Sequence, residues 1–96
     1  MKKLADIKDI LTRHKQRLYE QYGLNALAVF GSYGRGQQTN QSDVDILVEF
    51  KRPIGLEFID LAGELEKLLN LKVDLVSKRG IRPEYLLEIE PDLNYV

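Results

Sequence analysis

The sequence lacks cysteine and tryptophan, has only three prolines, and holds no apolar run long enough to cross a membrane. Without cysteine, disulfides, zinc ribbons and thiol catalysis are excluded, and the composition suits a reducing cytoplasm. Charge of one sign is lacking too, because 14 Lys and Arg stand against 15 Asp and Glu, for a net charge of -1. The one-sided basic field of a general nucleic-acid binder is therefore absent. We expect a cytoplasmic protein with no membrane segment and no direct nucleic-acid binding.

The length and composition fit one small globular domain spanning residues 1–96. Hydrophobic residues make up 44% of the chain and charged residues 30%, which is typical of a soluble globular protein. The Met1-Lys2-Lys3 start resembles the beginning of a signal peptide, but Asp6 and Lys8 interrupt any apolar segment behind it. A large enzyme with separate cofactor and substrate domains is excluded at this size.

The spacing of apolar residues predicts alternating helices and strands. Helices are expected at 4–22, 56–69 and 83–89, strands at 24–30, 43–50 and 72–76, and a functional loop at 33–42. This order predicts an α/β fold of the α+β type, a small mixed sheet of about three to four strands with helices packed on one face. Acidic side chains would occupy the opposite face. Apolar residues crowd the tail after Pro83, and they could belong to the core or form a partner surface.

Two aspartates, Asp43 and Asp45, begin the second expected strand. Their two-residue spacing places both carboxylates on one face, where they repel each other unless a cation lies between them. Mg²⁺ takes one or two protein carboxylates and completes its coordination with water and substrate phosphates. The pair therefore predicts the metal site of a nucleotide-using enzyme. The competing interpretation is a solvated strand start with a turn capped by Ser42.

A second pair, Gly31 and Ser32, ends the first expected strand. Gly31 permits close approach of the backbone, and Ser32 offers a hydroxyl and an amide to a phosphate oxygen. Asp74 on the third expected strand points the same way as Asp43 and Asp45, which would add a third carboxylate and permit two metal ions. Asp74 could also accept a proton from an attacking hydroxyl. Its alternative role is a simple ion pair with Lys72.

Together these segments resemble the polymerase-beta-like nucleotidyltransferases, specifically the minimal nucleotidyltransferase antitoxins that accompany HEPN-domain toxins. The resemblance lies in Gly31-Ser32, in 42–48 (SDVDILV) after a ten-residue spacer, and in 72–76 (KVDLV). It implies the polymerase-beta-like fold and a Mg²⁺-dependent transfer of AMP from ATP, with two ions expected. In the antitoxins the acceptor is a tyrosine hydroxyl of the toxin. It implies Asp43, Asp45 and Asp74 as catalytic and metal-binding residues, and Gly31 and Ser32 as phosphate contacts.

The loop departs from the family pattern at Tyr33, where many relatives have an arginine. Arg35 lies two positions on and is suited to phosphate oxygens, so either residue could face the triphosphate. Gly36 is expected to allow close approach to the nucleotide, whereas Gly34 could equally serve loop flexibility. Arg35 could also be an ordinary surface charge.

Three functions are compatible with these observations. The first is an antitoxin that transfers AMP to a cognate HEPN toxin and forms a hetero-oligomer with it. The second is a non-catalytic antitoxin that neutralises its partner by binding alone. The third is a small-molecule transferase of the aminoglycoside type, which ranks last because such relatives carry an extra domain for the acceptor. The sequence names neither the partner nor the nucleotide.

Overall fold

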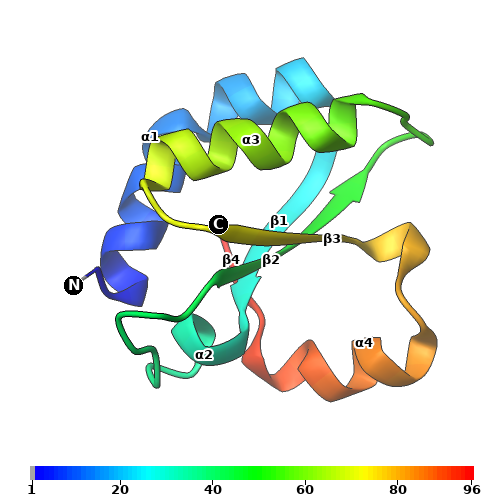
Figure 1. Cartoon of the computed structure of the whole chain (residues 1–96). Coiled ribbons are helices and arrows are strands. Elements are labelled where there is room, and N and C mark those ends of the chain that lie inside the picture. The colour runs from blue at the N-terminus through cyan, green and yellow to red at the C-terminus, as the bar shows by residue number, and fades with distance from the viewer. Residues whose placement is uncertain (1) are drawn as a thin grey trace.

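The structure, a computed structural model, describes residues 2–96 and contains one four-stranded mixed sheet with strand order β3-β2-β1-β4 (Figure 1). The helical segments are α1 (Leu4–Tyr22), α2 (Gly31–Gly34), α3 (Glu57–Leu69), η1 (Lys78–Gly80), α4 (Pro83–Ile89) and η2 (Glu90–Asp92). The strands are β1 (Leu24–Phe30), β2 (Val44–Phe50), β3 (Val73–Ser77) and β4 (Asn94–Tyr95). β1 pairs antiparallel with β2 and β4, and β2 pairs parallel with β3. The predicted mixed sheet is confirmed.

Each of the two long helices ends at a residue in the left-handed backbone conformation. Gly23 follows α1 with φ of 66°, and its amide bonds back to Tyr19. Asn70 follows α3 with φ of 54°, and its amide donates to the Glu66 carbonyl at 2.8 Å. Glycine and asparagine are the residues that adopt this conformation most readily. Gly23 therefore turns the chain directly into β1, whereas residues 70–72 connect α3 to β3, which begins one residue later than the sequence predicts.

One face of the sheet is fully packed against α1 and α3 (Figure 1). The apolar stripe of α1, represented by Ile7 and Leu11, and that of α3, represented by Leu61 and Leu65, are at most 1% exposed. They meet inward side chains of β1 and β2 such as Ile46. This main core supplies most of the apolar burial that stabilises the fold.

The opposite face is covered only in part, and here the structure differs from the expectation of helices on one face. The segment α4 crosses beneath the sheet (Figure 1), and its Ile89 packs with Phe30 and Leu47 in a second, smaller core. The seven residues of α4 are too few for their periodicity to show which face they cover. The rest of this face carries carboxylates.

The C-terminal tail belongs to the fold. The short strand β4, which the sequence did not predict, pairs Tyr95 with Ala28 and Asn94 with Val29. Val96 also donates its amide to the Leu27 carbonyl at 2.9 Å. A two-residue strand is below the length at which alternation can be recognised. Within residues 2–96, no helix is both long enough and apolar enough to cross a membrane.

Candidate active site

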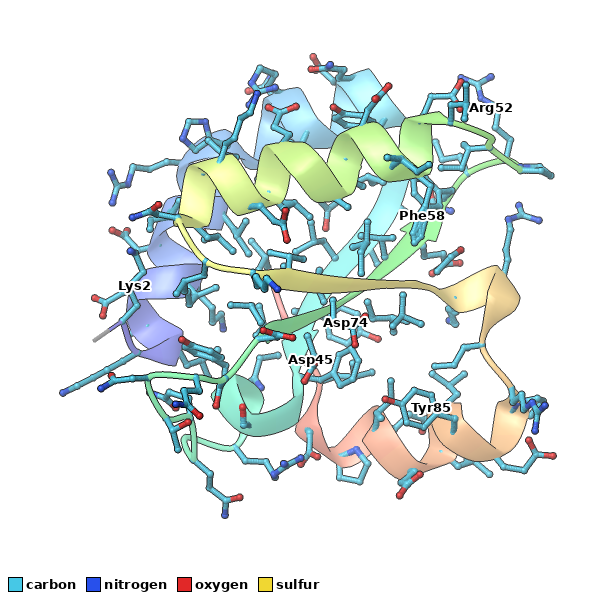
Figure 2. All side chains as sticks on the ribbon, viewed as in Figure 1. Lys2, Asp45, Arg52, Phe58, Asp74 and Tyr85 are labelled. Carbon is cyan, nitrogen blue, oxygen red and sulfur yellow. The ribbon has the colours of Figure 1, made fainter. Side chains whose placement is uncertain are left out.

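Two adjacent parallel strands place the predicted carboxylates on the open face of the sheet. Asp45 of β2 pairs in register with Asp74 of β3, so their α-carbons are neighbours across one inter-strand step of about 4.8 Å. Asp43 lies two residues before Asp45 and is exposed, as is Asp74, whereas Asp45 is half-buried. Figure 2 shows Asp45 and Asp74 next to each other on this face. The structure thus places Asp74 beside Asp45, and Asp43 and Asp45 line one cleft, whose walls do not include Asp74.

The surroundings of Asp45 disfavour the negative charge of its carboxylate. Burial raises the pKa of its carboxyl from the ordinary value of 3.8 to about 6, and the charges of Asp74 and Asp43 add to this effect. The guanidinium of Arg35 acts in the opposite direction and lowers that pKa. A carboxylate surrounded by like charges in this way favours binding of a cation.

The three carboxylates do not converge into one ready-made cage. Among residues 2–96, no group of three acidic or histidine side chains is close enough to hold a metal ion jointly. The register pairs Asp45 with Asp74, while Asp43 lies two residues before Asp45, just ahead of the first residue of β2. Mg²⁺ needs only one or two protein carboxylates, so a pair meets its requirement. The three-residue metal set stays a prediction.

Gly31 brings the backbone against the carboxylate of Asp45. Its φ is 69°, and a β-carbon at this position would overlap the Asp45 carboxylate, lying 2.9 Å from Cγ. Any side chain here would displace that carboxylate as well as strain the backbone. The glycine predicted to approach a phosphate therefore has a neighbour that the sequence did not indicate, Asp45 itself.

The loop after Gly31 contains Tyr33 and Arg35, the two residues that the sequence suggests as contacts to the triphosphate, and the structure distinguishes them. Tyr33 is 1% exposed and belongs to the main core, so it is not available to a ligand. Arg35 is exposed at the edge of the site, where its Nη1 lies 3.0 Å from Oδ2 of Asp92 in an ion pair. Its Nε donates to Gln37 at 3.2 Å. Gly36 has φ of 71° and no atom within 4 Å of its β-carbon position.

Asn94 fastens the tail to this loop. Its side-chain amide lies 3.2 Å from the Gly34 carbonyl, 3.3 Å from that of Val29 and 2.7 Å from that of Asp92. A β-carbon on Gly34 would lie 2.8 Å from the Asp92 carbonyl, so this glycine is required by close packing rather than by loop flexibility. The turn that carries Ser32 is thus held from the C-terminus.

Gly31, Arg35 and Asp45 belong to the wall of one cleft of about 370 Å³, and Asp74 lies outside that wall. Its walls are formed by Phe30, Gly31, Ser32, Arg35, Asp43, Asp45, Tyr85, Glu88, Ile89 and Asp92. The contribution from α4 and η2 was missed by sequence reasoning, because nothing in the spacing of the tail indicates that it returns to the Gly31-Ser32 turn. Figure 2 shows Tyr85 projecting from α4 towards the strand residues Asp45 and Asp74.

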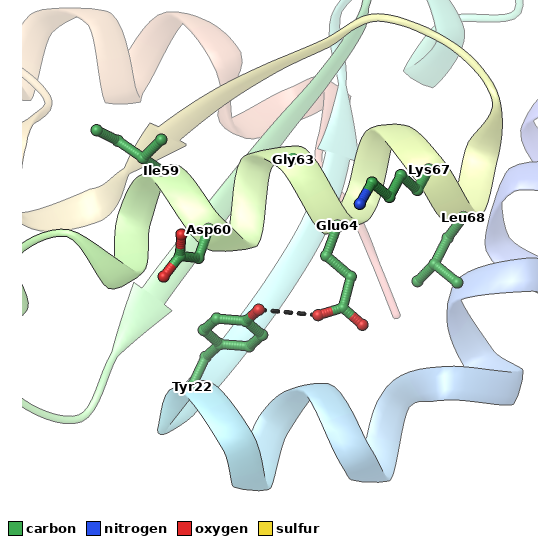
Figure 3. Close-up of a pocket in the computed structure, with 7 residues that line it drawn as sticks. All are labelled: Tyr22, Ile59, Asp60, Gly63, Glu64, Lys67 and Leu68. Atoms are coloured by element: carbon green, nitrogen blue, oxygen red, sulfur yellow. Dashed lines mark hydrogen bonds between the residues drawn. The ribbon is translucent and has the colours of Figure 1, made fainter.

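A larger hollow of about 580 Å³ lies between α1 and α3, away from these motifs (Figure 3). Two of its polar residues bond to each other, since Tyr22 donates to Glu64 at 2.8 Å, and Glu64 also pairs with Arg17 outside the hollow. Burial and the carboxylate of Glu64 raise the pKa of the Tyr22 phenol to about 12. Because these contacts connect α1 with α3, we interpret the hollow as part of the packing between two helices and not as a reaction site.

Two further ionisable residues, Glu49 and His14, lie outside the cleft. Glu49, on the acidic face but distant from the pair, lies 3.7 Å from the ammonium of Lys78 and therefore has a partner of its own. His14 is half-buried on α1 and is not among the residues that line the cleft.

Comparison with known proteins points to one family. The pattern of the nucleotidyltransferase domain matches residues 10–94. The chain is 50% identical over 98 residues to a "Putative protein adenylyltransferase" of Methanocaldococcus jannaschii, with all of both chains covered. It is 45% identical to the protein adenylyltransferase MntA of Thermococcus cleftensis, covering 97% of this chain and 95% of that one.

Solved structures agree. One described as a "putative minimal nucleotidyltransferase" superposes with a TM-score of 0.76 at 31% identity, covering 92% of this chain and 93% of that chain. Another, described as a toxin-antitoxin with AMP-PNP, has a TM-score of 0.62 at 30% identity and covers 73% of this chain and 59% of that one. The cleft lies in a fold that these proteins share.

Proposed function

The chain belongs to the nucleotidyltransferase domain family, and from this premise we propose that it transfers AMP from ATP to a hydroxyl of a partner protein. The observation that carries the proposal is the cleft in which Ser32, Asp43 and Asp45 meet. The names of its relatives, protein adenylyltransferases, support a protein as the acceptor. Binding of an ATP analogue by a related toxin-antitoxin supports ATP as the donor.

A divalent cation fits the residues of this cleft. Asp45 and Asp74 are hard oxygen ligands that face each other in register, and their mutual repulsion is relieved by a cation. Mg²⁺, when bound, would neutralise charge on the phosphates and lower the pKa of the attacking hydroxyl. The side chains of Asp45 and Asp74 would hold it, and Asp43, which lines the same cleft as Asp45, would be the further carboxylate of the proposed set.

Each remaining residue has a role that follows from its position. The hydroxyl of Ser32 is placed to donate to a phosphate oxygen, and Arg35 offers a guanidinium at the cleft edge. The acceptor oxygen bonds to the α-phosphorus, the bond to the bridging oxygen breaks, and pyrophosphate leaves. Asp74, on the exposed side of the pair, accepts the proton of the acceptor hydroxyl. Positioning and charge neutralisation account for most of the catalysis in such a transfer.

The partner we propose is a HEPN-type toxin, and the acceptor is one of its tyrosines, so the chain acts as an antitoxin. The cleft is open and its walls leave little protein to hold an acceptor, which therefore has to bring its own binding surface. A toxin in a hetero-oligomer meets this requirement. A free small molecule would have to bind in the cleft without that surface.

The test is transfer of label from ATP carrying radioactive α-phosphate to the protein encoded by the adjacent gene. Label should reach the partner with Mg²⁺ and should be absent with a chelator. Losing one group that stabilises the charge of the transition state typically costs about 10²- to 10³-fold in rate, and we expect at least this loss for Asp43→Ala and Asp45→Ala because each removes a proposed ligand of the metal ion. Asp9→Ala, which removes an exposed acid on α1, is the matched control.

Three outcomes separate the alternatives. Neutralisation of the partner without any transfer of label would favour an antitoxin that acts by binding alone. Label on a free small acceptor, with none on protein, would favour the small-molecule reaction. Transfer that survives Asp45→Ala would remove the cleft as the active site.

A further inference from the structure

The cleft contains a hydroxyl of this chain that the proposed reaction does not use, that of Tyr85. It belongs to α4, and its side chain lines the cleft together with Ser32 and Asp45. The side chain is 43% exposed, so the ring is accessible from solvent although it forms part of a wall. In Figure 2 the ring points from α4 towards Asp45 and Asp74.

The electrostatic surroundings agree with this placement. Burial raises the pKa of the Tyr85 phenol, and the charges of Asp45, Asp74 and Glu88 raise it further. Two of these carboxylates are the residues proposed to serve the reaction. The phenol therefore lies within the field of the groups that would receive an acceptor proton.

The other tyrosines have different surroundings. The chain has five. Tyr33 is buried in the main core, Tyr19 donates to the Val96 carbonyl at 3.2 Å, and Tyr22 donates to Glu64. Tyr95 is 56% exposed but is not part of the cleft wall. Among residues 2–96, Tyr85 is thus the one phenol in the cleft.

We propose that Tyr85 is itself an acceptor of AMP, so that the chain modifies its own phenol when no partner hydroxyl occupies the cleft. This inference rests on the proposed transfer of AMP from ATP. The phenolic oxygen of Tyr85 forms a bond to the α-phosphorus of ATP. The bond from that phosphorus to the bridging oxygen breaks, and pyrophosphate leaves with the electron pair. The phenol proton passes to Asp45 or Asp74 and then to water. The product is a phosphodiester of Tyr85.

The modified residue has a consequence for the site. AMP joined to Tyr85 would remain inside the cleft, because the ring forms part of its wall. It would occupy space that a second ATP or a partner tyrosine needs. Self-modification would therefore stop transfer to the partner, and the partner's acceptor and Tyr85 would compete for the same nucleotide.

The first experiment follows the purified full-length chain alone with ATP and Mg²⁺, by intact-protein mass spectrometry and peptide mapping. One AMP should appear, mapped to Tyr85 in the unaltered protein. It should be lost in Tyr85→Phe and retained in Tyr95→Phe, which is the matched control. The fraction modified per unit time should not change on dilution of the protein, because acceptor and site belong to one molecule.

A second readout does not depend on turnover. Ring-labelled tyrosine signals are followed by NMR while an ATP analogue with an uncleavable α,β-bridge is added together with Mg²⁺. The Tyr85 signal, assigned by its absence in Tyr85→Phe, should shift, and the Tyr95 signal should stay in place. A Tyr85 signal that does not respond would overturn the proposal.

The outcomes also distinguish this inference from the function on which it rests. Label on the partner with no AMP on the chain alone would overturn self-modification and leave the proposed function intact. AMP mapped to Tyr95 or to any other residue would equally overturn the assignment to Tyr85. Absence of label on both the partner and the chain would end the two proposals together.

Discussion

The two faces of the sheet differ in the side chains that they carry. The face under α1 and α3 buries a continuous set of apolar side chains such as Leu61 and Leu65, and in residues 2–96 no charged side chain is buried in it. The face above α4 has a small core around Ile89 and otherwise exposes carboxylates. Apolar burial on the packed face stabilises the fold, and this stability offsets the repulsion among the carboxylates on the open face. The same strand, β2, contributes to both because its side chains alternate.

The largest effect on stability is expected from the packed face. Leu65→Ala removes a fully buried side chain from the main core and should lower the free energy of unfolding by about 2–5 kcal/mol. Leu86→Ala removes a half-buried side chain from the small core on the open face, where we expect about 1 kcal/mol. Urea denaturation followed by circular dichroism measures both. Equal losses would mean that the open face contributes as much to stability as the packed one.

Two glycines with the same backbone conformation test how closely the open face is built. Gly31→Ala and Gly36→Ala each place a β-carbon at positive φ, which costs about 1–2 kcal/mol. Only at Gly31 does that carbon overlap a neighbour, the Asp45 carboxylate, so this variant should lose about 1–3 kcal/mol more. Thermal unfolding compares the two variants. Equal melting temperatures would show that Asp45 moves away without cost.

The raised pKa of Asp45 on the open face makes the stability of the fold depend on pH. The pKa of Asp45 is raised to about 6 in the folded chain, whereas the ordinary value is 3.8. The folded state therefore binds this proton more tightly than the unfolded state does. Stability contributed by the protonated carboxyl is present below pH 3.8 and is lost as the pH rises through about 6.

Asp45→Asn should for this reason stabilise the metal-free protein at pH 8 while it abolishes transfer. Because the carboxyl is only half-buried, solvent screening limits the gain to about 1 kcal/mol, or ~4–8 °C in melting temperature. The advantage over the unaltered chain should shrink between pH 6 and pH 4. Asp9→Asn, which removes an exposed ion pair on α1, should give no such gain. A destabilised Asp45→Asn would contradict the assignment of strain to this face.

The packed face was predictable from the sequence and much of the open face was not. The 3.6-residue spacing in 4–22 and 56–69 identifies both long helices, and the two-residue spacing of Asp43 and Asp45 identifies their common face. Which strand lies beside β2 depends on long-range packing, so the register between Asp45 and Asp74 needed the structure. The same holds for Tyr85, since seven residues of α4 contain too little pattern to show where that helix packs.

The smallest effect concerns the ion pair between Arg35 and Asp92 at the cleft edge, in which the arginine side chain is 44% exposed. Asp92→Asn keeps an oxygen that can accept from Arg35 and removes one negative charge, so stability should fall by no more than ~0.2–1 kcal/mol. The same charge repels a triphosphate, and its removal should lower the KM for ATP by about 1.4- to 5-fold, the equivalent of that energy. Steady-state transfer to the partner measures this, with Asp9→Asn as the variant that loses a comparable ion pair without a change in KM. A raised KM would instead mean that Asp92 holds Arg35 ready for the phosphates, and that the open face is preorganised as tightly as the packed one.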